Sequence, residues 1–286
     1  MHFPVMLDES LAYLSVKPDG IYLDATVGLG GHTAAIARRL TSGRVIAMDR
    51  DAQSLEIARR NTSEWSSRIC YHHGPFSRLQ DALRSCGVEK VQGILADLGV
   101  SRFQLTEPER GFSLMADGPL DMRMDRSQGE PASDLVNFAS EKELADLIFQ
   151  LGEERRSRRI TRAIVRARPI HSTLQLAQVI EQAVPRTGKL HPATQTFMAL
   201  RMAVNDELGE LDRFLSIAPE LTTPGGRIVV ITFTSLEDRP VKRKFQELAR
   251  SGRATLLAKH VIKPANEEVR HNPASRSAKL RALEMN

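Results

Sequence analysis

The sequence is poor in the residues on which several classes of site depend. Its two cysteines, Cys70 and Cys86, do not form a C-x-x-C pair, which argues against a thiolate zinc site and against disulfide bonds in a reducing cytosol. We therefore interpret both cysteines as packing residues. The eight histidines are scattered, and the only adjacent pair, His72-His73, has no metal-ligand spacing around it. No bound metal is expected.

Long apolar runs are also missing. The longest purely aliphatic run, Ile228–Ile231, is far short of the roughly 20 residues that a membrane span needs, and no signal peptide opens the chain. We expect a cytoplasmic protein that does not enter a membrane. Aromatic residues make up only 5% of the chain, but 41% of its 286 residues are hydrophobic, which is enough for one or two domains with a full core.

Three short apolar segments each end in an aspartate. They are Ile21–Asp24, Val45–Asp49 and Gly93–Asp97. In open α/β sheets ligands bind at the carboxyl ends of the strands, where these three carboxylates would converge. Packing alone does not require acids at three successive strand ends, so the pattern indicates a ligand site.

A glycine-rich loop follows the first of these segments. It contains Gly28, Gly30 and Gly31. A dinucleotide loop would have a third glycine where Thr33 stands, and no Lys or Arg lies between Asp24 and Thr33 to hold a pyrophosphate. Asp24 instead suits a cationic ligand, and Asp49, about 20 residues past the loop, suits ribose hydroxyls. S-adenosylmethionine has a sulfonium, an ammonium and a ribose. The alternative is that the glycines only form a tight turn.

Strand and helix patterns alternate through the first half of the chain, which predicts a parallel, doubly wound α/β sheet. The expected helices are 33–40, 52–61 and 77–85, and the expected strands are 21–24, 45–49, 68–72 and 93–97. A long loop over 99–129 interrupts this alternation.

A helical block follows the loop, and the sheet pattern then resumes. Ser140 and Ser172 are expected to begin helices through capping boxes. The later expected elements are a long helix over 193–217 and strands at 227–233, 254–262 and 279–283. We therefore expect one discontinuous sheet domain, 1–130 with 204–286, which is interrupted by an all-helical insertion over 131–203.

The net charge is +5, and the positive residues are unevenly distributed. Seven arginines and no acid lie between Arg155 and Arg168, and a second basic stretch runs from Arg239 to Arg281. Four of the arginines recur at helical spacing and would form one stripe: Arg155, Arg158, Arg162 and Arg166. Such a stripe is typical of surfaces that bind nucleic-acid phosphates, and the alternative is a merely solvated helix face.

Several segments, in order and over nearly the whole chain, resemble one family. They are Thr26–His32, Asp97–Ser101, Glu109–Ser113, Gly118–Asp125, Gly152–Ile160, His191–Thr194, Ala203–Leu208 and Ser235–Arg239. The family is that of the bacterial 16S rRNA (cytosine-N4)-methyltransferases, RsmH or MraW. The resemblance implies a class I (Rossmann-like) methyltransferase fold with a helical insertion and S-adenosylmethionine as methyl donor. It also implies a cytidine in the decoding region of 16S rRNA, free or in the small ribosomal subunit, as acceptor. It leaves a homodimer open.

The resemblance also implies particular site residues. The family's cofactor contacts fall on Gly30, Gly31, His32, Asp49, Phe76, Asp97 and Gln104. The residue pattern alone already indicates the two glycines and the two aspartates among them, whereas His32, Phe76 and Gln104 rest on the resemblance. The insertion, with its arginine stripe, would be the RNA-recognition domain.

The chemistry of the implied reaction indicates further residues. The exocyclic amine of cytosine is a poor nucleophile because its lone pair is delocalised into the ring, so acceptors that orient the amine would help. The expected acceptors are Asp97, the Leu98 and Gly99 carbonyls, and Ser101. The base must also be unstacked, and Phe103 or Phe112 could either stack on it or only anchor the loop.

The sequence departs from the family pattern at two places. Arg102-Phe103 follows Ser101 where the family usually has Ser-Pro, and Thr234 replaces a histidine of a Phe-His-Ser-Leu-Glu-Asp-Arg segment. The identity of any general base is therefore open. Two other functions also remain as alternatives. One is a dinucleotide oxidoreductase, which Thr33 disfavours, and the other is a non-catalytic ribosome-assembly factor with a relic pocket, which Thr234 would fit.

Overall fold

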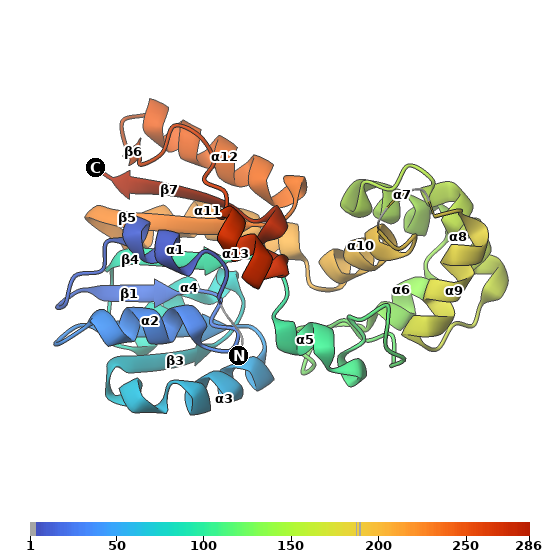
Figure 1. The fold of residues 1–286 in the computed structure, drawn as a ribbon, viewed down its shortest axis with the longest axis horizontal. Helices are drawn as coiled ribbons and strands as arrows, with labels where there is room; N and C mark the ends of the chain where they lie inside the picture. The colour runs from blue at the N-terminus through green and yellow to red at the C-terminus, as the bar shows by residue number, and fades with distance from the viewer. Residues whose placement is uncertain (1–3, 187, 189) are drawn as a thin grey trace. The chain divides into compact units, whose positions relative to one another are not determined.

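The computed structural model describes residues 4–186, 188 and 190–286, and the chain divides into two compact units (Figure 1). The first unit comprises the residues up to Gly99 together with Leu208–Asn286, and the second comprises Val100–Glu207. The second unit thus begins well before residue 131, where the helical insertion was expected. The reason is packing, because Phe112, Leu120 and Met122 lie in the same apolar core as the helices of that unit.

In the described residues the first unit contains one seven-stranded sheet. Its strands are β1 (Ile21–Asp24), β2 (Arg44–Asp49), β3 (Ile69–His73), β4 (Val91–Asp97), β5 (Thr222–Thr232), β6 (Ala254–Leu256) and β7 (Lys279–Met285). The order across the sheet is β3-β2-β1-β4-β5-β7-β6. β1 to β5 pair in parallel, and β7 runs antiparallel to its neighbours β5 and β6. The expected α/β class is confirmed.

Helices cover both faces of this sheet (Figure 1). One face carries α1 (Leu7–Leu14), α2 (Gly31–Arg39) and α3 (Ala52–Asn61), and the other carries α4 (Leu79–Ser85), α11 (Glu207–Leu221) and α12 (Ser235–Arg250). Successive strand residues point to opposite faces, so Ile94 lies in the core with Phe214 while Leu95 lies in the core with Ile36. None of the helices in the described ranges has the length and apolarity that spanning a membrane requires.

The long helix expected over 193–217 is two helices, so this expectation was wrong. α10 spans Thr194–Val204 with Asn205 as its C-cap, and α11 begins at Glu207. The Asn205 side chain accepts a hydrogen bond from the Met124 amide at 2.8 Å and donates one to the Met122 carbonyl at 2.7 Å. Asp206 has a φ of 45°, in the left-handed region, and a residue in this conformation cannot continue a right-handed α-helix. The break therefore results from contacts that are distant in sequence.

The second unit is helical. Besides α10 it contains α5 (Arg102–Thr106), α6 (Ala132–Phe138), α7 (Glu141–Gly152), α8 (Ser157–Ala167) and α9 (Thr173–Ala183). Ser140 forms the expected capping box with Glu143. Ser172 caps α9 by accepting from the Gln175 amide, but the Gln175 side chain accepts from the His171 amide, so only half of that box is present.

The segment expected as a long loop over 99–129 is organised around Arg110. This side chain is 1% exposed and donates to the carbonyls of Arg123 and Met124 at 3.0 and 2.9 Å. Its guanidinium carbon lies 5.8 Å from the ring centroids of both Phe103 and Phe112. Phe112 is buried in the core of the unit, which favours the anchoring interpretation for this ring.

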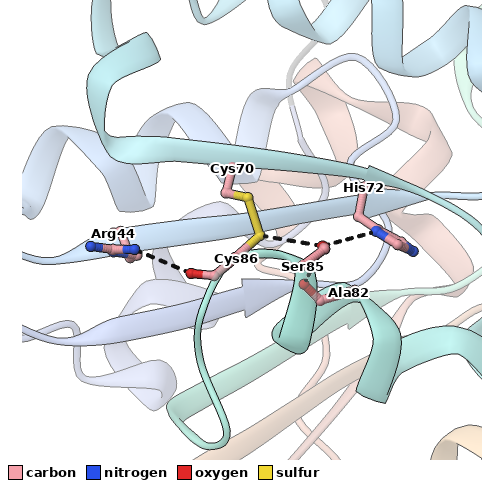
Figure 2. The surroundings of a disulfide bond; sticks show 6 residues. All are labelled: Arg44, Cys70, His72, Ala82, Ser85 and Cys86. Carbon is pink, nitrogen blue, oxygen red and sulfur yellow. Dashed lines mark hydrogen bonds between the residues drawn. A yellow bond between two sulfur atoms is a disulfide. The ribbon is translucent and has the colours of Figure 1, made fainter.

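The interpretation of the two cysteines as separate packing residues was wrong, because Cys70 and Cys86 form a disulfide (Figure 2). Cys70 lies on β3, and Cys86 directly follows α4. The helix that follows a parallel strand packs back onto the sheet, and here this return brings the two residues together. Around the bond, Arg44 donates to the Cys86 carbonyl at 3.3 Å, and Ser85 Oγ lies within hydrogen-bond distance of His72 Nδ1.

We expect replacement of both cysteines by serine to lower the free energy of unfolding by about 3 kcal/mol, because the bond joins residues 16 positions apart and so closes a loop in the unfolded chain. Urea denaturation of the variant and of the parent protein would measure the difference. Denaturation of the parent in excess reducing agent should give the same loss. Equal stability of the two proteins under oxidising conditions would contradict the bond.

Candidate active site

The three strand-end aspartates lie on adjacent strands, as the sequence predicts. β1 is the middle strand of the three and pairs with both β2 and β4. Its last residue, Asp24, is opposite Ala47 of β2 and Leu95 of β4, so Asp49 and Asp97 each lie two residues further along their strands. At the carboxyl end of the sheet, Asp24 is therefore set back relative to Asp49 and Asp97 on the two neighbouring strands.

Asp24 is turned toward its own loop. It is fully buried, its Oδ2 accepts a hydrogen bond from the Thr33 hydroxyl at 2.6 Å, and its Oδ1 accepts from the Thr26 amide at 3.2 Å. Burial raises the pKa of Asp24 to about 6, although these hydrogen bonds oppose the shift. Thr33, which stands where a dinucleotide loop has its third glycine, therefore has a defined structural role as a donor to this carboxyl.

Asp49 holds the glycine loop. Its Oδ2 accepts from the Gly28 amide at 2.7 Å and its Oδ1 from the Asp51 amide at 2.9 Å. Burial raises the pKa of Asp49 to about 6. A carboxylate has about four acceptor positions, so each oxygen can still accept from a hydroxyl of a ligand.

The glycines are required by backbone geometry at two positions. Gly28 has a φ of 53° and Gly30 a φ of 89°, both in the left-handed region. A Cβ on Gly30 would also lie 2.8 Å from the Thr62 side chain. α2 begins at the next residue, Gly31, so the loop delivers a free helix amino terminus to the sheet edge.

Asp97 is the third strand-end aspartate of the site. Its Oδ1 is buried and has no hydrogen-bond partner among the described residues, while its Oδ2 lies 3.9 Å from His32 Nδ1. Burial raises the pKa of Asp97 well above its ordinary value, and the negative charges of Asp24 and Glu237 add to this shift. An unpaired buried oxygen costs free energy unless a ligand supplies a donor.

His32 lies between the start of the chain and this carboxyl. Its Nε2 is 3.1 Å from the Val5 carbonyl, which can only accept, so Nε2 carries the hydrogen and Nδ1 faces Asp97. The structure thus brings together Asp97 and His32, although only the family resemblance had indicated the histidine.

Phe76 begins a short 3₁₀ turn (Phe76–Arg78) beyond the carboxyl end of β3. Its ring packs on Phe214 of α11, with 5.2 Å between centroids and 53° between planes. The ring remains partly exposed, and its contact with the cofactor stays a prediction.

Two predicted site residues, Ser101 and Gln104, belong to the second unit. Ser101 Oγ accepts from the Gln104 amide at 3.3 Å, and the Gln104 side chain accepts from the Ser101 amide at 2.9 Å. The two residues form the capping box of α5. Their S-x-x-Q spacing is typical of a capping box and could have predicted this start of a helix. The structure brings these two residues together with each other, and their proposed roles in chemistry and cofactor binding stay predictions.

Glu237 is a residue that the sequence reading did not single out. It is buried, and its Oε2 accepts from the amides of Phe233 and Thr234 at 2.8 Å each. Thr234 Oγ1 accepts in turn from the Glu237 amide, so Thr234 caps α12 at the position where the family has histidine. The T-x-x-E pattern could have indicated this box.

These features define the ligand that the first unit can hold. Buried carboxyls with raised pKa values favour a cationic partner, the Asp49 oxygens suit hydroxyls, and the glycine loop admits a close approach. The strand order with one antiparallel strand next to the edge, together with this loop, defines the class of S-adenosylmethionine-dependent methyltransferases of Rossmann-like fold.

Comparison with known proteins places the chain within that class. The family model of the MraW methylase family matches residues 1–286, and the chain belongs to this family. A protein of Solibacter usitatus, named Ribosomal RNA small subunit methyltransferase H, is 66% identical over 285 residues, with 100% of each chain covered. A protein of the same name from Acidobacterium capsulatum is 47% identical, with 99% of this chain and 98% of its own length covered.

Solved structures support the fold alone. A candidate methyltransferase from Streptococcus mutans in complex with SAH aligns with a TM-score of 0.51 and 12% identity, covering 100% of both chains. A candidate rRNA-methylase from Clostridium thermocellum aligns with a TM-score of 0.50 and 14% identity, again over 100% of both chains. S-adenosylmethionine is the cofactor of the chain, as its family membership indicates.

The residues of the first unit fit this cofactor. Asp97 is at the advanced carboxyl end of β4, so its carboxyl can face the positive charge of the cofactor. Asp49 would hold the ribose hydroxyls next to the loop amide that it already binds.

We expect the affinity for S-adenosylmethionine to fall as the pH is lowered from about 7.5 to about 5. Strong hydrogen bonds from the ribose hydroxyls require an ionised Asp49, and the pKa of this carboxyl is raised to about 6. At pH 5 a group of this pKa is mostly protonated, so each carboxylate that must ionise lowers the affinity about tenfold. Calorimetry should also show proton release on binding near pH 6. An affinity that is constant across this range would contradict the assignment.

We expect Asp49→Ala to lower the affinity for S-adenosylmethionine tenfold or more. The variant loses the acceptor for the ribose and also releases the Gly28 amide, and a hydrogen bond to a charged group contributes about 1.5–3 kcal/mol. Asp49→Asn keeps one acceptor oxygen and should lose less. Asp81→Ala, which removes an exposed carboxylate from α4, is the matched control. Unchanged calorimetric affinity of Asp49→Ala would exclude the ribose role.

Proposed function

We propose that the chain transfers the methyl group of S-adenosylmethionine to the exocyclic N4 amine of a cytidine in the decoding region of 16S rRNA. The names of its close relatives, which are small-subunit ribosomal RNA methyltransferases, support an rRNA substrate. The observation that carries the choice of an amine is the unpaired, buried Oδ1 of Asp97 at the carboxyl end of β4. This oxygen is a hydrogen-bond acceptor without a donor, and an amine supplies one.

When bound, the cofactor supplies an electrophilic methyl group. Asp97 would accept a hydrogen bond from the amine and so orient its lone pair, which is positioning rather than covalent catalysis. In its ionised form Asp97 can also take the proton that the amine gives up, and its raised pKa makes this carboxylate a stronger base. The backbone amide of Asp97 donates to the Thr26 hydroxyl at 2.6 Å, which fixes the strand end that carries it. Ser101 is proposed as a further acceptor.

The cysteines give no support to methylation at carbon 5 of the ring. That route needs a cysteine nucleophile next to the base. Cys70 and Cys86 are joined to each other, and Cys70 is opposite Ile46 of β2, three residues before the pair formed by Asp49 and His73 at the strand end. A direct attack by the amine is therefore the proposed route.

The helical segment 131–203 is the proposed RNA-recognition domain. On α8, Arg158, Arg162 and Arg166 are four residues apart and exposed, while Ile160 and Ile164 are buried on the opposite side of the helix. Arg155, also exposed, precedes this helix. The stripe is not neutralised by the nearby acid Glu154, because that carboxylate binds Arg156 at 3.1 and 3.2 Å.

The test of the proposed function is mass spectrometry of digested small-subunit rRNA after incubation with the protein and isotopically labelled S-adenosylmethionine. We expect label in N4-methylcytidine within the decoding region. Label on carbon 5 would contradict the proposed chemistry. Binding of rRNA without any methyl transfer would instead favour the assembly-factor alternative.

A further inference from the structure

A small hollow in the first unit lies outside the site described above. It lies between α12 and the segment from β6 to β7, and its volume is about 40 Å³. Lys242, Lys259 and His260 are exposed at its rim, and the side chains of Phe245 and Leu256 form an apolar floor. A water molecule needs roughly 10–15 Å³ of such space, so the hollow has room for about three waters or for one group of similar bulk.

The charged side chains that line this hollow are all positive. No Asp or Glu is among its lining residues. The nearest acid on α12, Asp238, is already held by Arg281 through two hydrogen bonds of 2.7 and 3.0 Å. Within the described residues, neither Lys242 nor Lys259 makes a hydrogen bond or an ion pair, whereas Lys244 on the same helix pairs with Glu247 at 3.0 Å. Two lysines with unpaired ammonium groups thus line one small hollow.

The segment around the hollow also carries mainly positive charge. From Arg239 to Arg281 the sequence has twelve Lys and Arg residues and three Glu residues. One of these three, Glu268, accepts from the Met6 amide, and another, Glu247, is taken by Lys244. Arg239 and Arg243 are exposed on α12 next to the hollow. Their positive field would attract a polyanion rather than a single small ion.

The hollow lies in the same unit as the proposed methyl-transfer site, beside the helix that follows β5. α12 begins at Ser235, directly beyond the carboxyl end of β5, and β5 pairs with β4, which carries Asp97. Lys242 is seven residues into this helix, which corresponds to about 10 Å along its axis. An RNA strand that presents a base to Asp97 would therefore pass within reach of the hollow with a neighbouring nucleotide.

We infer that this hollow binds a backbone phosphate of the RNA substrate through Lys242 and Lys259. The inference rests on the proposed function and adds an RNA contact in the sheet unit, separate from the arginine stripe. Lysine binds phosphate as a compact point charge, and the free oxygens of one phosphate match the space available. The apolar floor suits the adjoining sugar and gives no acceptor that would compete for the ammonium groups.

The test compares two double variants in filter binding to purified small-subunit rRNA over 50 to 200 mM salt. Lys242→Ala with Lys259→Ala should weaken binding about eightfold near 0.1 M salt and reduce the slope of log K against log salt by about one unit, the contribution of one phosphate contact. Lys17→Ala with Lys90→Ala removes two exposed lysines that precede β1 and β4, at the opposite edge of the sheet, and should change neither value. Both variants should bind S-adenosylmethionine as the parent does.

The outcomes separate this inference from the proposed function. If the parent protein binds no small-subunit rRNA, the proposed function is overturned and this inference with it. If the parent binds but the Lys242 and Lys259 variant has the affinity and slope of the control, only the phosphate site is overturned. Retained rRNA affinity together with lost binding of a polyglutamate probe would assign the hollow to an acidic protein partner and would likewise overturn the RNA site.

Discussion

Asp97→Ala should lower the rate of methyl transfer about a hundredfold, which is the typical contribution of a positioned polar group to a transition state. The variant should not lose stability. In the parent, Asp97 Oδ1 is buried without a partner and the pKa of the carboxyl is raised by burial, so removal of the group relieves a cost of folding. A thermal midpoint that is unchanged or higher, combined with a large loss of rate, is the expected signature of a residue kept for its chemistry.

Two companion measurements make this result specific. Asp97→Asn retains an acceptor oxygen but cannot take up a proton, so its rate should lie between those of the parent and the alanine variant. Asp81→Ala, at an exposed position on α4, should retain the parental rate. Single-turnover kinetics at saturating cofactor would separate the chemical step from binding. A rate within threefold of the parent in Asp97→Ala would contradict the assignment of Asp97 to the methyl-transfer step.

Replacement of Arg158, Arg162 and Arg166 by alanine should weaken binding of small-subunit rRNA by about 500-fold near 0.1 M salt if each arginine contacts one phosphate. The salt slope should fall by roughly one unit for each lost phosphate contact. The three side chains are exposed, and the packing of α8 depends on Ile160 and Ile164 instead, so the fold should be unaffected.

The matched control removes three exposed arginines from the first unit, Arg38, Arg39 and Arg84, and should leave the slope unchanged. This control separates a local contact from an effect of net charge. The affinity for S-adenosylmethionine should be parental in both triple variants. If the salt slope is the same for the α8 variant and the parent, the stripe is a solvated helix face and another surface binds the RNA.

The parts of the structure that the sequence predicts well are those determined by local pattern. β1 and α3 have the expected bounds, and the carboxylates of Asp24, Asp49 and Asp97 lie at adjacent strand ends. Hydrophobic alternation and strand-terminal acids are properties of short segments, and the right-handed crossover rule then places successive strands side by side.

The parts that it misses depend on contacts between distant segments. Asn205 ends α10 because its side chain binds backbone groups of Met122 and Met124, which no pattern around residue 205 records. The pairing of Cys70 with Cys86 similarly depends on the return of α4 onto the sheet. In contrast, the capping boxes at Ser101 and Thr234 are local and could have been recognised, but a functional interpretation of the same residues obscured them.

The stagger of the three strand ends has a consequence for the size of the ligand. Asp49 and Asp97 are separated by β1, so the two advanced carboxyls lie two strand spacings apart, or roughly 10 Å, while Asp24 leaves a notch between them. A molecule must span this distance to engage both ends at once. A ligand held at both ends would thus be selected by its length as well as by its charge.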